Sequence, residues 1–161
     1  MSRWGIIKRL ALVTAVLLLA TTWVSYFDIQ GRSFANKLMD FRLLGYTAVD
    51  AETFVSTLNI EEKDAYHDVY RILDFVFIGF LCALLYALAK AMQRAGARSA
   101  LLLATLLFVG LDITENLLVP AIIEGDFSRA DLAGWVTLLK FLAISGVGVI
   151  LFVTWRRKGF S

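Results

Sequence analysis

Four long apolar stretches constrain the fold of this sequence more than any other feature. They lie at about residues 10–27, 69–89, 101–122 and 132–155. A helix needs about 20 mostly apolar residues to cross the hydrocarbon core of a bilayer. With 59% hydrophobic residues in 161, the chain is too apolar for an ordinary soluble domain. We therefore predict an all-α membrane protein with a single four-transmembrane-helix domain over residues 1–161, in which short connections make consecutive helices antiparallel neighbours in one bundle.

The first apolar stretch also has features of a secretory signal peptide. It follows the basic residues Arg3, Lys8 and Arg9. Its apolar run is longer than that of a usual signal peptide, however, and no clear A-x-A cleavage site follows it. We expect an uncleaved membrane anchor, whereas cleavage would leave three spans.

The charged residues outside the four stretches predict the orientation of the chain. The N-terminal segment, the connection between the second and third stretches and the C-terminal segment contain basic residues and no acid. The alternate segments contain eleven acidic and five basic residues. Because basic residues favour the cytoplasmic side, we expect an inner-membrane protein with both termini in the cytoplasm. The nine basic residues are Arg3, Lys8, Arg9, Lys90, Arg94, Arg98, Arg156, Arg157 and Lys158.

Composition argues against several other classes of protein. The net charge of +2 is too small to suggest nucleic-acid binding, so the expected partner is the lipid bilayer. The single cysteine, Cys82, lies among apolar residues and favours a packing role. No Cys/His pattern has zinc-ligand spacing, and GxSxG, HExxH and P-loop motifs do not occur. The sequence therefore assigns neither a cofactor nor a catalytic motif.

The first outer connection, about residues 28–68, has helical patterning of its own. Gly45 is suited to end its first helix, and a helix-start pattern near residue 60 places the beginning of the second span outside the bilayer. We expect short helices here that form an extracytoplasmic cap. They either lie on the lipid interface or cover the end of the bundle, or they act as a moving lid or a partner-binding surface. The candidate helix starts are Ser33, then Thr47 or Asp50, then Asn59 with its capping-box partner Glu62.

Ionisable residues inside the apolar stretches mark a candidate site, because lipid solvates charge poorly. At about 1.5 Å per residue, the deepest of the polar residues lie about 3 to 9 Å outward of the membrane midplane. They are Asp74, Asp112, Glu115, Asn116 and Lys140. Helical spacing places the members from each stretch on one face, which predicts a single polar cluster open to the outside through His67 and Arg71. The candidate residues are His67 just before the second stretch, Tyr70, Arg71 and Asp74 in the second stretch, Asp112, Glu115 and Asn116 in the third, and Lys140 in the fourth.

Charge compensation within this cluster suggests what it can bind. Lys140 is the natural partner of the carboxylates in the third stretch, and Arg71 can serve the outer carboxylates. This leaves at most one net negative charge, which could bind a proton or another cation. The alternative is a purely structural network that sets helix register and pairing.

A set of short motifs also resembles a known group of proteins. The motifs are Asp40-Phe41-Arg42, Gly45-Tyr46, Tyr66, Leu73-Asp74, the run from Leu111 to Asn116 and Leu139-Lys140. Together they resemble a group of small, uncharacterised bacterial four-span membrane proteins that carry an intramembrane LDxxEN element. The resemblance covers most of the chain and implies the fold and the importance of the polar positions, but no activity.

Three classes of function follow. The first is binding of a small ligand, ion or lipid headgroup in an outward-facing intramembrane polar cavity. The second is an intramembrane enzyme acting on a lipid or isoprenoid, with Asp112 or Glu115 as acid/base, or with Asp74, Glu115 and His67 as metal ligands. The third is a structural or regulatory subunit of a membrane complex. Transport would require a homo-oligomer, because four spans rarely enclose a path.

Overall fold

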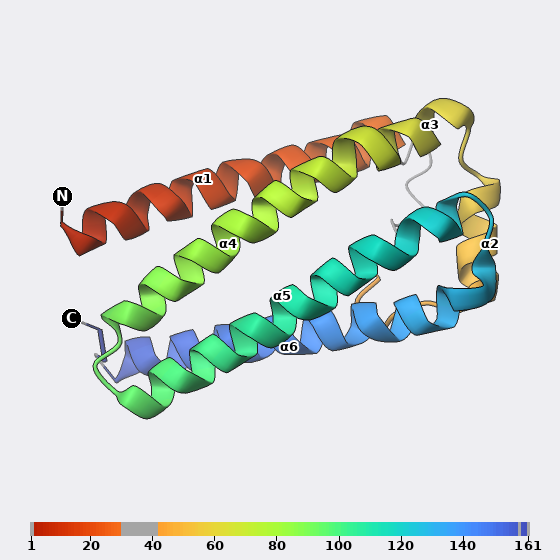
Figure 1. Cartoon of the computed structure of the whole chain (residues 1–161). Coiled ribbons are helices and arrows are strands. Elements are labelled where there is room, and N and C mark those ends of the chain that lie inside the picture. Colours follow the sequence, from red (N-terminus) through yellow and green to blue (C-terminus); the bar gives the residue numbers. More distant parts are fainter. Residues whose placement is uncertain (1, 30–41, 158, 161) are drawn as a thin grey trace.

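Four helices in the computed structural model are long and apolar enough to cross a membrane (Figure 1). The structure describes residues 2–29, 42–157 and 159–160, and this part of the chain contains helices and no strand. The four apolar helices are Arg3–Ile29, Ile60–Ala91, Ala95–Ile123 and Phe127–Arg156. The predicted all-α class and the four membrane-spanning candidates are therefore confirmed by length and composition.

Each of these four helices is longer than the apolar stretch that predicts it. They contain between 27 and 32 residues, or about 40 to 48 Å at the rise of an α-helix. A hydrocarbon core is about 30 Å thick, so their ends extend beyond it. The regular elements are α1 (Arg3–Val24), a π-helical turn (Ser25–Ile29), α2 (Ala48–Ser56), α3 (Ile60–Ala65), a second π-helical turn (Tyr66–Tyr70), α4 (Arg71–Ala91), α5 (Ala95–Ile123), a 3-10 turn (Phe127–Arg129) and α6 (Ala130–Arg156).

The long helices pack in chain order. α1 packs against α4, α4 against α5, and α5 against α6, with the α5–α6 contact the most extensive. Figure 1 shows that successive long helices run in opposite directions, so both termini and the α4–α5 turn lie at one end. α2 and α3 lie at the other end. We call these the terminal end and the cap end.

The short helices of the cap end are begun by local hydrogen bonds. Thr47 and Asp50 form a reciprocal capping box at the start of α2, and Asn59 and Glu62 form another at the start of α3. The hydrogen bonds from Thr47, above all that from its backbone N–H, lower the pKa of Asp50. The stabilisation that Asp50 provides is therefore present above its ordinary pKa and is lost on acidification through its lowered pKa.

The chain segment before α2 lies directly on α6. Gly45 has a positive φ of 74°, which favours glycine, and its N–H donates to the carbonyl of Arg42 at 2.8 Å. A Cβ atom on Gly134 of α6 would lie 2.8 Å from the backbone nitrogen of Tyr46, so the backbones touch where α6 has no side chain. Asp131 adds a hydrogen bond from the Ala48 N–H at 2.7 Å. The helix expected to begin at Ser33 lies outside the described residues.

This close approach predicts that Gly134→Ala destabilises the protein by about 1–3 kcal/mol, because the Tyr46 backbone must move away from the new methyl group. Gly146→Ala is the matched control on the same helix, since no atom lies within 4 Å of a Cβ there. It should have little effect or stabilise the helix by up to about 1 kcal/mol. Thermal melting in detergent measures both changes. Equal melting temperatures for the two variants would show that the segment does not rest on α6.

Candidate functional site

A buried layer of polar side chains connects α4, α5 and α6. α5 supplies Asp112, Glu115 and Asn116 at i, i+3 and i+4, on the face that also buries Phe108 and Val119. Asp74 joins them from α4, and Thr137 and Lys140 join them from α6, one helical turn apart. We call these six residues the polar layer.

Lys140 is shared by two carboxylates of α5. Its Nζ lies 3.1 Å from Oδ1 of Asp112 and donates a hydrogen bond to Oε2 of Glu115. The other carboxylate oxygen of Glu115, Oε1, accepts a hydrogen bond from the hydroxyl of Thr137. The same hydroxyl lies 3.0 Å from the carbonyl of Ala133 in its own helix. One glutamate is therefore held by two residues of α6 at once.

Asn116 extends these contacts to α4. Its Nδ2 donates to Oδ2 of Asp74 at 2.6 Å and to the backbone carbonyl of Asp112 at 3.2 Å. Pro120, one turn further along α5, has no N–H to donate to the Asn116 carbonyl, so that oxygen lacks its usual helical partner. The layer thus combines carboxylate, amide and hydroxyl groups from three helices, and two of its carboxylates contact the Lys140 ammonium.

Burial makes these contacts energetically important. Glu115 is 1% exposed, Asp112 4% and Lys140 8%. Removing one member of a buried ion pair costs about 3–5 kcal/mol, because the other charge remains without compensation. An exposed ion pair contributes only about 0–1 kcal/mol. Because all three partners are buried, the Lys140 contacts fall in the range of buried ion pairs.

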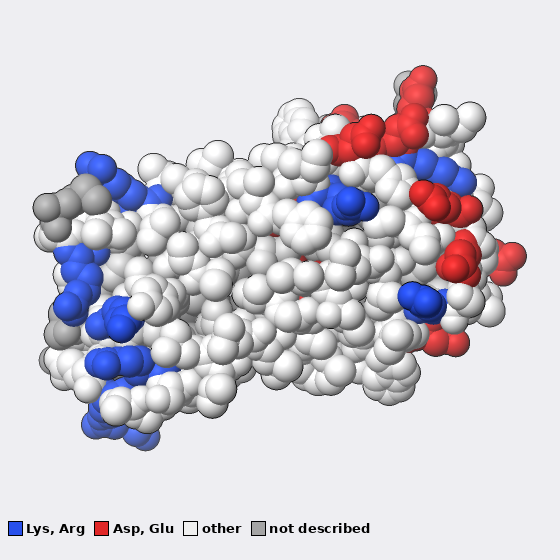
Figure 2. Space-filling model, in the orientation of Figure 1, with Lys and Arg blue, Asp and Glu red and all other residues white. Residues whose placement is uncertain are grey.

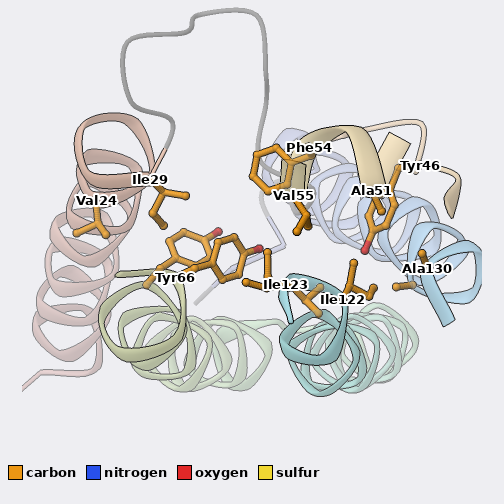
Figure 3. Close-up of a cluster of buried hydrophobic side chains, with 13 residues drawn as sticks. Val24, Ile29, Tyr46, Ala51, Phe54, Val55, Tyr66, Ile122, Ile123 and Ala130 are labelled. Atoms are coloured by element: carbon orange, nitrogen blue, oxygen red, sulfur yellow. The ribbon is translucent and has the colours of Figure 1, made fainter. Parts of the chain in front are cut away.

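A cluster of buried apolar side chains, the apolar layer, lies on the cap side of the polar layer, and Figure 3 shows its members. On α5 its buried members lie one to two turns beyond Asn116, and on α6 they lie one to two turns before Thr137. Tyr66 and Tyr70 join them from the π-helical turn before α4. Phe54 and Val55 of α2 complete it from the cap, together with Ile29 after α1. The buried members of the apolar layer are Val24, Ile29, Tyr46, Ala51, Phe54, Val55, Tyr66, Tyr70, Val119, Ile122, Ile123, Ala130 and Ala133.

A second apolar cluster lies on the other side of the polar layer, toward the terminal end. It contains Leu85 and Ala89 of α4, Leu101 of α5 and Val147 of α6, together with Met92. The polar layer therefore has packed hydrophobic side chains toward both ends of the molecule.

The structure places His67 near Glu124, away from the contacts just described. The Nε2 atom of His67 lies 4.0 Å from Oε1 of Glu124, and Tyr70 belongs to the apolar layer. Arg71 is half-buried at the first position of α4. His67 lines a cavity of about 260 Å³ with Lys63, Asp64 and Glu124, and no residue of the polar layer lines that cavity.

A π-helical turn explains this separation. The N–H of Arg71 donates to the carbonyl of Tyr66, five residues earlier. In a regular α-helix it would donate to the carbonyl of His67, four residues earlier. A π-turn adds a residue to the helical repeat, so the spacing of a regular α-helix does not carry from His67 to Asp74.

Among the described residues, no three His, Cys, Asp or Glu side chains are placed to hold a metal ion. His67, Asp74 and Glu115 are therefore not brought together as ligands.

Sequence reasoning missed two residues that shape the polar layer. Thr137 lies three residues before Lys140, so helical spacing already placed it on the lysine's face. Pro120 lies four residues after Asn116, the spacing at which a proline releases a carbonyl. Both signals were available in the sequence, although only the packing of α5 against α6 gives Thr137 its glutamate partner.

No protein-family model, curated protein or solved structure matches this chain. The resemblance to four-span proteins with an LDxxEN element therefore stays a prediction that rests on the residues quoted for it.

The shared ammonium predicts that Lys140→Met destabilises the protein by about 3 kcal/mol or more, because two buried carboxylates lose their ion-pair partner. Combining it with Glu115→Gln or Asp112→Asn should restore much of this loss. Lys90→Met, at the exposed end of α4, is the control and should change stability by less than about 0.5 kcal/mol. Unfolding free energies in mixed detergent measure the coupling. Purely additive losses in the double variants would contradict the ion-pair assignment.

Proposed function

We propose that this protein is a multi-pass membrane protein that binds a small cation, in the simplest case a proton, at the carboxylates of the polar layer. The observation that carries this proposal is the sharing of Lys140 by Asp112 and Glu115 in a buried position. Two negative charges that face one ammonium repel each other, and an added proton or cation relieves that repulsion.

The size of the ligand follows from the packing around the site. A small organic ligand or a lipid headgroup needs an open cavity, whereas an ion needs only a few oxygen atoms. The polar layer has packed apolar side chains toward both ends. The oxygens of Asp112, Glu115 and Asn116 are the kind of ligands that hard cations prefer. An ion is therefore the ligand class that fits this geometry best.

A structural role is the second candidate, and a specific observation favours it. The contacts of Glu115 with Thr137 and Lys140 lie within the most extensive helix pair, α5 and α6. A network of this kind can set the register of two helices in a membrane without binding any ligand. The two candidates differ in whether the protein responds to protons or cations.

The proposed setting is the bacterial inner membrane, with the four long helices as an antiparallel bundle. On the face drawn in Figure 2, Lys and Arg without acidic neighbours gather at the terminal end, acidic side chains gather at the cap end among a few basic ones, and most of the surface between is uncharged. By the positive-inside rule the terminal end faces the cytoplasm, and α2 and α3 form a cap on the outer side. The polar layer then lies in the outer half of the membrane.

Melting temperatures across a pH series and with added Na⁺, K⁺ or divalent cations test the function. A ligand that binds only the native state stabilises it by about 2.7 kcal/mol at 100 times its Kd. The wild type should respond, and Asp112→Asn or Glu115→Gln should lose the response while staying folded, because each keeps shape but removes charge. Glu52→Gln, an exposed carboxylate of α2, is the matched control and should respond like the wild type. Identical responses of all four proteins would contradict cation binding at the polar layer and favour the structural role.

The orientation is tested by cysteine labelling in a Cys82→Ala background. Gln93→Cys in the α4–α5 turn should react only with a reagent that reaches the cytoplasm, because basic residues surround it. Glu52→Cys and Asp126→Cys should react from the outside. All three positions are exposed, so access is limited by the membrane alone. Reaction of Gln93→Cys with an impermeant reagent from outside would reverse the orientation.

A further inference from the structure

A small cavity with two arginines lies at the terminal end, far from the polar layer. Its volume is about 190 Å³. Arg94 and Ala97 line it from the start of α5, and Val153, Thr154 and Arg157 line it from the end of α6. Gly159 closes the remaining side.

The C-terminal residues hold this cavity in shape. The N–H of Gly159 donates to the carbonyl of Thr154 at 3.0 Å, and its carbonyl accepts from the N–H of Gln93 at 2.9 Å. Phe160 forms an isolated antiparallel bridge with Met92 and an edge-on ring contact with Trp4. The chain end is thus tied to both the α4–α5 turn and α1, so the cavity wall is built from hydrogen-bonded backbone.

The electrostatics of the cavity favour an anion. Residues 75–111 and 132–161, which include the whole inner part of α4, α5 and α6, contain no acidic residue. Within the described part of the chain, no carboxylate pairs with Arg94 or Arg157. The first N–H groups of α5 add partial positive charge, since its N-cap residue makes no side-chain capping bond. Guanidinium groups bind phosphate well because their N–H groups match its oxygens.

The position of the cavity points to a lipid as the source of that anion. Trp4 and Trp155 are exposed at the same end, and exposed indoles favour the headgroup level of a bilayer. Val153 lines the cavity and is also 40% exposed on the apolar surface of α6. A headgroup in the cavity would therefore be continuous with acyl chains along that surface.

We propose that this cavity binds the phosphate group of an anionic membrane lipid, with the guanidinium groups of Arg94 and Arg157 as its partners. Basic pockets between transmembrane helices on the cytoplasmic side bind such headgroups in other membrane proteins. The site is independent of cation binding in the polar layer, since the two share no residue.

Native mass spectrometry of the full chain in detergent tests this site by comparing phosphatidylglycerol with phosphatidylcholine of the same acyl chains. The wild type should retain phosphatidylglycerol preferentially and melt at a higher temperature with it. Arg94→Gln with Arg157→Gln should weaken that binding roughly 30-fold, or about 1 kcal/mol per arginine. Ala97→Leu, which keeps both arginines and fills the cavity, should also lose the preference.

The matched control is Lys90→Gln with Arg156→Gln, which removes the same charge from neighbouring positions outside the cavity. It should retain the lipid preference. Equal losses in the two double variants would overturn the site in favour of a diffuse basic surface, and an unchanged lipid preference of Ala97→Leu would also overturn it.

Competition with inorganic phosphate distinguishes a lipid headgroup from free phosphate. If phosphate displaces phosphatidylglycerol and also stabilises the wild type in the absence of lipid, the source is free phosphate and the lipid assignment is overturned.

Discussion

The interaction on which the interior of this molecule depends is the ammonium of Lys140 between the carboxylates of Asp112 and Glu115. All three residues are almost fully buried and lie within helices that are apolar enough to span a membrane. A bilayer provides no water to solvate them, so each charge depends on the others. This requirement favours one register of α5 against α6 and one rotation of each helix about its axis. In that arrangement Thr137 also binds Glu115.

The apolar clusters on either side place the polar layer in surroundings of low polarity. At the cap end, residues from α2 and from the turn after α1 pack with the π-helical turn before α4, with α5 and with α6 (Figure 3). Low polarity around an ion pair strengthens its electrostatics and also raises the cost of any unbalanced charge. Gain or loss of a proton or small cation, the ligand class proposed above, would therefore change the energy of this layer strongly.

The two ends of the molecule differ in charge and in construction. The cap end is acidic and contains short helices begun by capping boxes, with Asp131 of α6 accepting a hydrogen bond from the start of α2. The terminal end is basic and is closed by the C-terminal residues, which bind the α4–α5 turn. This asymmetry, visible in Figure 2, suits a molecule with one face toward the cytoplasm and anionic lipids.

The sequence by itself determined the features that depend on local spacing and composition. Helix length, the segregation of basic residues, the capping boxes at Thr47 and Asn59 and the shared face of Asp112, Glu115 and Asn116 all follow from neighbours within a few residues. These properties need no knowledge of how the helices pack.

Only the tertiary structure decided which side chains meet. His67 was expected beside Asp74, but the π-helical turn at Tyr66–Tyr70 shifts its register and it lies near Glu124 instead. The touching backbones of Tyr46 and Gly134, and the cavity between Arg94 and Arg157, join residues that are distant in the chain. Such contacts depend on helix rotation and on the path of connecting segments, which are set by packing over the whole molecule and not by any local pattern.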